Sequence, residues 1–309
     1  MSKIKTAFDM LAHNRSAFMA LLVENCNFLF SDERYLKLVF KYRMGYKLDL
    51  QNPRTYNEKL QWLKLNDRNP LYTRLVDKHE VKAYVTERVG LEYVIPEIGL
   101  WNTPEEIEWA KLPQRFVLKT THGGGNTGVV VCRDKDDLDI ELTKKKLDES
   151  MKQDLYKDSR EWPYKSVPKR ILAEEYVEDA ATQELRDYKF FCFDGEVRFL
   201  FVGSERQKPG EDVKFDFFDK DYNHLVIRQG HPNSKVLPEK PSCFEEMKQV
   251  AEKLSQGIPH VRVDLYEANG HVYFGEMTFY HFGGVVPFEP AKWDDEFGTM
   301  IKIPRIKTY

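Results

Sequence analysis

The chain contains few cysteines, no long apolar run and no long block of basic residues. Its four cysteines are widely spaced and include no C-x-x-C pair, so we expect reduced core thiols in a reducing compartment. No stretch approaches the roughly eighteen consecutive apolar residues of a transmembrane helix. The N-terminus also lacks the basic, apolar and small-residue progression of a signal peptide. These absences predict a cytoplasmic protein.

Neither sign of charge dominates the chain, which has 47 basic and 50 acidic residues and a net charge of −3. The basic residues are interspersed with acidic ones, which argues against a general nucleic-acid surface. The 309 residues, 41% of them apolar, have a folded composition and not a disordered one. This length accommodates two domains or one large α/β domain with a substantial core.

One loop gathers four of the seventeen glycines, at positions 123, 124, 125 and 128, between two β-rich runs. It matches neither G-x-x-x-x-G-K-[ST] nor a dinucleotide fingerprint, because a Val-rich strand follows it where a helix would be needed. Glycine N–H groups can approach an anion closely, and Lys119 at the end of the first run adds a positive charge. The pattern predicts a strand, a phosphate-binding loop and a second strand. An ordinary surface hairpin with solvated side chains is the alternative.

Helical periodicity predicts two or three helices over residues 4–46 and one helix over 71–89. Between them, Thr55 and Glu58 have the spacing of a capping box and predict a capped amphipathic helix to Leu65. Thr103 followed by Pro104 predicts another helix start. The apolar segment 18–23 could touch a membrane surface, but it has little basic character, so we favour packing against neighbouring helices.

The remaining chain alternates between expected strands and helices. Asp194-Gly195 and Asn269-Gly270 are two-residue turns that predict hairpins over 188–202 and 261–279. The strand expected over 171–177 carries Glu174 and Glu175, and a buried strand rarely holds two carboxylates without partners. Further expected strands cover 94–101 and 213–222, a loop covers 229–241, and helices cover 142–156 and 244–254.

Asp264 and Glu276 stand six residues before and six after Gly270, on the two arms of the second hairpin. This symmetry places them roughly opposite each other, where cross-strand side chains can share a cation. Two oxygen ligands without nearby Cys or His suit Mg²⁺, which takes its other ligands from water and phosphate. Two exposed carboxylates on a polar sheet face are the alternative. A glycine-rich loop, a carboxylate-bearing strand and a carboxylate hairpin, in this order, predict an ATP site.

These residues, taken in order, resemble the ATP-grasp superfamily. Within it, the run from Thr55 to Trp62 with Asp77-Lys78 downstream resembles the TupA-like branch, named for teichuronopeptide biosynthesis. The resemblance covers about residues 50–290 and implies a nucleotide held between two α+β lobes. It divides the chain into an N-terminal helical extension (1–50), a preceding helical and α/β segment (51–115), a glycine-loop lobe (116–175) and a C-terminal metal-binding lobe (176–309).

The resemblance also implies roles for individual residues. Lys78 and Lys119 match the lysines that reach the α and β phosphates, and Asp187 is the candidate ribose ligand. Lys189 is placed beside the transferred phosphate, and the third metal position, usually Asn, is Thr278 here. The other implied nucleotide contacts are Gly123, Gly124, Gly125, Thr127, Glu174, Glu175, Tyr176 and Val177, and the metal ligands are Asp264 and Glu276. Further candidates for orienting the substrate or stabilising charge are Arg198, Arg262 and His122, for which a structural role, such as a surface ion pair or a loop histidine, is the alternative. The run Tyr280–Gly284 follows the metal strand, where the family often places acceptor contacts.

The implied activity is ATP- and Mg²⁺-dependent ligation of a carboxylate to an amine through an acylphosphate. The family's name suggests the uronic acid of a cell-surface or capsular polysaccharide as the carboxylate, and an amino acid or amino alcohol as the amine. The same nucleotide site would serve a kinase acting on a glycan hydroxyl. A third hypothesis is a non-catalytic nucleotide-binding subunit of a polysaccharide-assembly complex, in contact with the inner face of a membrane.

Overall fold

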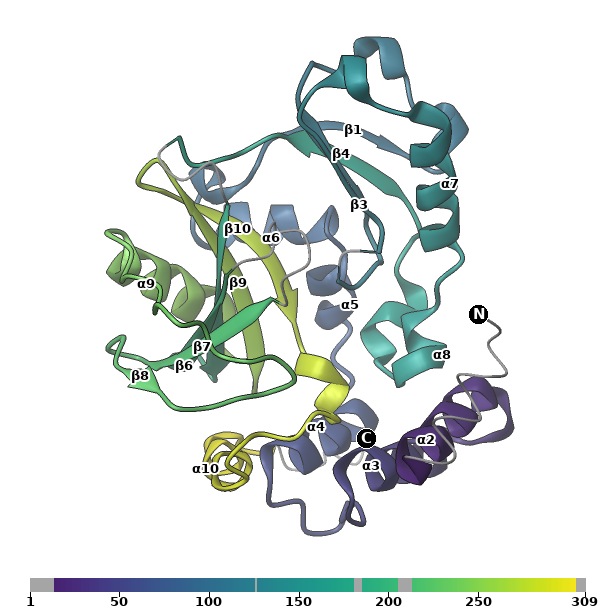
Figure 1. Ribbon diagram of the computed structural model, residues 1–309, viewed down its shortest axis with the longest axis vertical. Coiled ribbons are helices and arrows are strands. Elements are labelled where there is room, and N and C mark those ends of the chain that lie inside the picture. The colour runs from purple at the N-terminus through teal and green to yellow at the C-terminus, as the bar shows by residue number, and fades with distance from the viewer. Residues whose placement is uncertain (1–13, 126, 181–184, 205–212, 304–309) are drawn as a thin grey trace.

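The computed structural model describes residues 14–125, 127–180, 185–204 and 213–303. Two antiparallel sheets stand apart in the molecule, with the helices α5 (Leu71–Val76) and α6 (Glu80–Arg88) between them (Figure 1). The expected α+β class is confirmed. In the described part of the chain, no helix combines the length and hydrophobicity needed to cross a bilayer.

The first sheet has the strand order β1-β4-β2-β3. Alternation along its strands turns Phe116, Leu118 and Ile171 toward α7 (Ile140–Met151), where they form a small core with Leu147. The same alternation leaves Lys119 on the opposite face of this sheet. That face is turned toward the second sheet (Figure 1). The strands are β1 (Glu97–Trp101), β2 (Phe116–Thr120), β3 (Val129–Cys132) and β4 (Ile171–Glu175), so the glycine loop joins paired strands as expected.

The second sheet has the order β10-β9-β5-β6-β7-β8 and contributes most of the main core. Both expected hairpin turns form, because Asp194, Gly195, Asn269 and Gly270 all take positive φ angles, from 51° to 85°. Helix α9 (Phe244–Ser255) covers one face of this sheet (Figure 1). The strands are β5 (Arg186–Phe193), β6 (Glu196–Ser204), β7 (Lys214–Asp219), β8 (His224–Leu225), β9 (Val261–Ala268) and β10 (His271–Thr278).

The N-terminal helices are α2 (Arg15–Asn25) and α3 (Asp32–Met44), joined by the short turn η1 (Asn27–Leu29). Helix α4 (Tyr56–Asn66) begins with the expected capping box: the Thr55 side chain accepts from the Glu58 N–H, and the Glu58 carboxylate accepts from the Thr55 N–H. The remaining helical segments are η2 (Leu91–Tyr93), η3 (Pro104–Glu106), η4 (Trp109–Lys111), η5 (Lys135–Asp137), α8 (Leu155–Ser159), η6 (Trp162–Ser166), η7 (His281–Gly284) and α10 (Lys292–Met300).

Three helix predictions need correction. The helix expected over 142–156 ends at Met151 in α7 (Ile140–Met151), and the separate helix α8 (Leu155–Ser159) begins after the N-cap Asp154. The helix expected over 71–89 is broken at Asp77, whose extended backbone ends α5 and whose carboxylate accepts from the N–H groups of His79 and Glu80 at the start of α6. The helix expected after Thr103 is only the single turn η3, since Ile107 is already extended. The break at Asp77 matters for function because it presents Lys78 on a non-helical segment.

Candidate active site

Three charged side chains meet on the face of the first sheet opposite α7. Glu174 on β4 pairs with Lys119 on β2 at 2.5 Å and with Lys82 on α6 at 2.7 Å. Burial on its own raises the pKa of Glu174, but the two lysines outweigh it and the net pKa is lowered. The sequence prediction that this carboxylate has a partner is thus confirmed. Lys82, which no sequence motif distinguishes, is also a member of the cluster.

Lys78 connects the glycine loop to the carboxylate hairpin. Its backbone N–H donates to the Thr121 carbonyl (3.1 Å), and its ammonium donates to the Gly123 carbonyl. The same ammonium lies 3.8 Å from Oε2 of Glu276 on β10. Burial lowers the pKa of Lys78, and the neighbouring Lys119 adds to this, whereas Glu276 opposes it. One lysine therefore spans the two sheets at the position where the sequence predicts phosphates.

The start of the glycine loop is packed tightly against β2. A methyl group at Gly123 would come within 2.5 Å of Oγ1 of Thr120, and that hydroxyl is already hydrogen-bonded to the Ser150 hydroxyl at 2.8 Å. Gly128 faces the same two hydroxyls. Glycine is thus required here for close approach of the chain, whereas Gly125 takes a positive φ of 61° with open space around it. Thr127, by contrast, is exposed.

We expect Gly123→Ala to lower the free energy of unfolding by about 1–3 kcal/mol, because a β-branched, buried Thr120 cannot swing away from the added methyl group. Urea denaturation measures this loss. Combining it with Thr120→Ala removes the clashing hydroxyl, so the double variant should lose less than the sum of the two single losses. Strictly additive losses would contradict the steric explanation.

The carboxylate hairpin brings its predicted ligands together around a guanidinium. Asp264 on β9 and Glu276 on β10 are cross-strand partners, as expected from their spacing. Arg262 donates from Nε and Nη2 to the Asp264 carboxylate at 2.6 and 2.7 Å, and from Nη2 to Glu276 (3.2 Å) and the Thr278 hydroxyl (3.0 Å). All three predicted metal ligands therefore contact one cationic side chain.

A second cation sits on the other side of Asp264. The Lys189 ammonium on β5 contacts Asp264 and lies 2.6 Å from the Asp187 carboxylate. Burial raises the pKa of Asp264, and the charges of Arg262 and Lys189 limit that rise. Burial also acts on Glu276, but Lys78, Lys189 and Arg262 prevail and lower its pKa to about 2. Asp187, Lys189 and Arg262 thus lie together in this cluster, and their roles toward a nucleotide stay predictions.

The donor set fits a magnesium ion in its chemistry. Asp264, Glu276 and Thr278 supply hard oxygen atoms, and the Glu276 side chain keeps 32% of its surface accessible. No third His, Cys, Asp or Glu joins the pair as a metal ligand among the described residues. A bound Mg²⁺ would therefore need water and phosphate oxygens, and Arg262 would give up its contacts with Glu276 and Thr278.

His281 in η7 fixes the far side of Arg262. Arg262 Nη1 donates to Nδ1 of His281 (2.7 Å), so Nε2 carries the ring proton and donates to Oε1 of Gln229 (3.0 Å). Both His281 and Gln229 are fully buried. Burial and the charge of Arg262 hold the pKa of His281 well below its usual value, so the ring stays neutral. The run 280–284, predicted as a site candidate, thus positions Arg262.

Sequence reasoning missed a polar stripe on α4. Asn57 donates to Asp294 on α10 (2.9 Å), while Gln61 and Lys64 donate to the Gly283 carbonyl at 2.9 and 2.8 Å. Burial lowers the pKa of Lys64 to about 8. The signal was available, because polar residues at positions 57, 61 and 64 have the i, i+4, i+7 spacing of one helix face. This stripe anchors the segment that holds His281.

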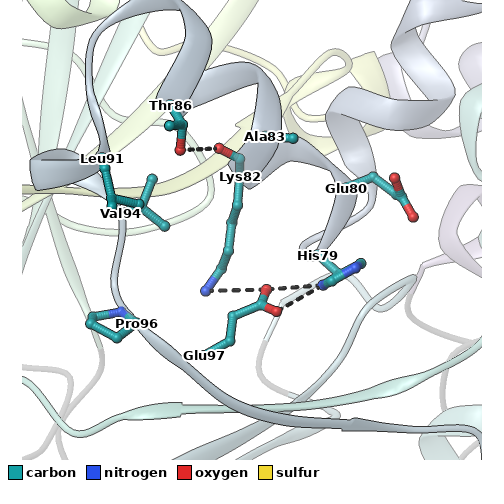
Figure 2. Close-up of a pocket in the computed structure, with 9 residues that line it drawn as sticks. All are labelled: His79, Glu80, Lys82, Ala83, Thr86, Leu91, Val94, Pro96 and Glu97. Carbon is teal, nitrogen blue, oxygen red and sulfur yellow. Dashed lines mark hydrogen bonds and ion pairs between the residues drawn. The ribbon is translucent and has the colours of Figure 1, made fainter.

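A cavity of about 400 Å³ adjoins the Lys82–Glu174 pair. Figure 2 shows Lys82 of α6 and His79, the residue before α6, converging on Glu97. The Lys82 ammonium lies 3.5 Å and Nδ1 of His79 lies 2.9 Å from the Glu97 carboxylate. Apolar groups form its other wall. Its lining residues are His79, Glu80, Lys82, Ala83, Thr86, Leu91, Val94, Pro96 and Glu97. Glu97 is also the cross-strand partner of Glu174, so the cavity and the lysine cluster share one edge of the first sheet.

The structure does not bring every predicted residue into the cluster. Arg198 is exposed on β6 and pairs with Glu196, so its interpretation as a substrate-orienting residue needs correction. Tyr176 lies under the Arg115 guanidinium, 4.0 Å from the ring centre. His122 is buried beside the glycine loop, and burial lowers its pKa to about 4.

Adenine contacts from Glu175, Tyr176 and Val177 remain a prediction, as do the proposed domain boundaries. Asn126 of the loop lies outside the described residues.

Three solved ATP-grasp enzymes illustrate what the chain is similar to. ATP-grasp ligase PsnB, complexed with minimal precursor, Mg and ADP, shares 12% identity at a TM-score of 0.38, over 72% of this chain and 57% of that one. D-alanine–D-alanine ligase from Bacillus anthracis, complexed with ATP, shares 14% sequence identity at a TM-score of 0.41, over 74% of this chain and 60% of that one. The Helicobacter pylori D-alanine–D-alanine ligase shares 16% sequence identity at a TM-score of 0.40, over 87% of this chain and 67% of that one. The chain thus spans less than two thirds of the first two proteins.

The family assignment rests on the sequence. No curated protein sequence matches the chain significantly. The profile of the TupA-like ATP-grasp family, however, matches residues 58–302, which is most of the chain and includes every charged residue of the cluster. The resemblance that the ordered motifs indicated is therefore confirmed, and the chain belongs to the TupA-like ATP-grasp family.

Proposed function

We propose that the protein is an ATP- and Mg²⁺-dependent ligase that joins a carboxylate to an amine. The observation that carries this proposal is the convergence of Lys78, Lys119 and the glycine loop with Asp264 and Glu276 from the other sheet. A triphosphate needs cations and backbone N–H groups on one side, and carboxylates that hold a metal on the other. Family membership supports the same interpretation.

In this proposal, the chain's own groups bind and orient the phosphates. Lys119 and Lys78 would exchange their present partners, Glu174 and the Gly123 carbonyl, for phosphate oxygens. Lys189 and Arg262 would place positive charge beside the γ-phosphate, where charge is redistributed during transfer. His281 and Gln229 would keep the guanidinium oriented.

Asp264, Glu276 and Thr278 would hold the Mg²⁺. When bound, the ion supplies charge neutralisation across the phosphates. The residues around it have the complementary task of excluding water, because an acylphosphate hydrolyses. The full burial of Asp264, His281 and Gln229 is consistent with this requirement.

The reaction balances in two steps. A substrate carboxylate oxygen attacks the γ-phosphorus, the bond to the bridging oxygen breaks, and acylphosphate and ADP form. The amine nitrogen then attacks the acyl carbon, phosphate leaves, and the nitrogen loses a proton to give the amide. We further propose a uronic acid of a cell-surface or capsular polysaccharide as the carboxylate, and an amino acid or amino alcohol as the amine. The family's name motivates both choices.

The test is ADP release from ATP and Mg²⁺ across a panel of uronic acids and amino acids. Release should require both a carboxylate and an amine. Lys119→Met should lower it about a hundredfold, because one positive charge is lost where the phosphates bind. Lys111→Met is a matched control, since Lys111 is largely exposed and pairs with Glu108.

The alternatives give different results in the same experiment. A stable phosphoester that forms without any amine would replace the ligase proposal with glycan phosphorylation. ATP binding without turnover on every acceptor would favour a nucleotide-binding subunit of an assembly complex. Equal release by wild type and Lys119→Met would mean that the lysine cluster is not the nucleotide site.

A further inference from the structure

The helix α2 presents an apolar face to solvent. Leu21 and Leu22 are exposed, and the following turn η1 exposes Phe28 and Leu29 to 78% and 64%. Large apolar side chains are common singly on protein surfaces, but here they follow one another along a single helix and turn. We call the set Met19, Leu21, Leu22, Phe28 and Leu29 the α2 face.

The other side of α2 is already used for packing. Ala20 and Val23 are buried, and Val23 joins a small core with Tyr35, Leu36 and Phe40 of α3. The α2 face therefore points away from α3. Figure 1 shows α2 at the periphery, with α3 between it and α4, and far from the two sheets. The face is not a surface of the candidate active site.

The N-terminal extension differs in charge from the chain as a whole. Residues 1–50 contain eight basic and five acidic residues, a net charge of +3, whereas the whole chain has −3. On the described part of this extension, four basic residues form no ion pair with a described carboxylate: Arg15, Arg34, Lys41 and Lys47. Two of these cations lie beside the α2 face: Arg15 is the first residue of α2, and the Arg34 guanidinium lies 5.7 Å from the centre of the Phe30 ring, directly after η1. An apolar strip with unpaired cations at its ends is complementary to a surface that is apolar inside and anionic outside.

We propose that the α2 face docks on the surface of an anionic lipid bilayer. Leu22, Phe28 and Leu29 enter the boundary between headgroups and acyl chains, and the neighbouring cations contact the lipid phosphates. The helix lies in the plane of the surface and does not span it, in keeping with its eleven residues. The candidate active site lies between the two sheets, away from α2, so this docking leaves it clear of the lipid surface (Figure 1). The inference does not depend on the proposed catalytic activity.

The experiment is co-sedimentation of the full chain with vesicles of phosphatidylcholine that contain phosphatidylglycerol, beside vesicles of phosphatidylcholine alone. We expect binding to the anionic vesicles only, and weaker binding at high salt. The double variant Leu22→Glu/Phe28→Glu should reduce the bound fraction about tenfold, because two carboxylates replace apolar groups at the lipid boundary.

Val236→Glu is the matched control, since Val236 is 84% exposed and lies outside the α2 face. It should bind like the wild type. Circular dichroism checks that each variant is folded, which both substitutions permit because the replaced side chains are exposed. The proposal is overturned if the wild-type protein does not co-sediment with anionic vesicles, or if the double variant binds them as well as the wild type does. Light scattering that shows a dimer lost only in the double variant, without vesicle binding, would identify a second copy as the occupant instead.

Discussion

Replacing Asp264 with asparagine should lower the free energy of unfolding by about 3–5 kcal/mol and abolish carboxylate-dependent ADP release. Asp264 is completely buried and accepts hydrogen bonds from Arg262 and Lys189. Asparagine has nearly the same shape but no charge, so two buried cations lose the carboxylate that they share. Among the described carboxylates, Lys189 then keeps only Asp187 and Arg262 keeps only Glu276. The same change removes a proposed Mg²⁺ ligand, which accounts for the loss of activity.

Urea denaturation and ADP release, measured on the same preparation, separate the two effects of Asp264→Asn. Asp221→Asn is the control, because Asp221 also pairs with a lysine (Lys220, 2.7 Å) but on an exposed turn. There the loss should be below about 1 kcal/mol, since water screens the pair. A similar small loss in Asp264→Asn would contradict the idea that this carboxylate neutralises the cluster.

The pairing of Asp264 with Glu276 illustrates how sequence reasoning succeeded. The turn Asn269-Gly270 sets a register in which His271 faces Ala268, and this register, if continued, would place Gly275 opposite Asp264. A bulge between Phe274 and Glu276 shifts the pairing by one residue and brings Glu276 opposite Asp264. The symmetric spacing predicted the pair correctly, but the sequence pattern alone did not reveal the bulge on which the pairing depends.

Local signals predicted the hairpins, the capping box and the order of the charged motifs, because each depends on residues close in the chain. The partners of those motifs depend on tertiary packing. Lys82 has no distinguishing local pattern, and only the approach of α6 to β4 shows that it neutralises Glu174. Arg198 is the converse case, since it lies on a buried sheet yet alternation turns it to solvent.

Three buried histidines link the fold's stability to pH. Burial lowers the pKa of His122 to about 4 and of His260 to about 3, and holds that of His281 well below its usual range. His260 is fixed between the Tyr56 hydroxyl (2.8 Å) and the Cys192 carbonyl (2.9 Å). The folded protein therefore keeps these rings neutral, whereas the unfolded chain binds a proton on each below pH 6.5.

Stability should therefore fall on mild acidification, because the unfolded state takes up three protons that the folded state excludes. Between pH 7 and 5.5 each ring lowers the free energy of unfolding by about 1.3 kcal/mol, so the three histidines together contribute a loss of about 4 kcal/mol over this range. Urea midpoints at intervals of pH measure the slope. His122→Gln removes one of the three titrating groups and should reduce the drop by about a third. The ring of His122 makes no hydrogen bond of good geometry with the described residues, so the substitution breaks no such bond. An unchanged slope in this variant would show that His122 is protonated in the folded protein, and that the buried ring is accommodated as a cation beside the glycine loop.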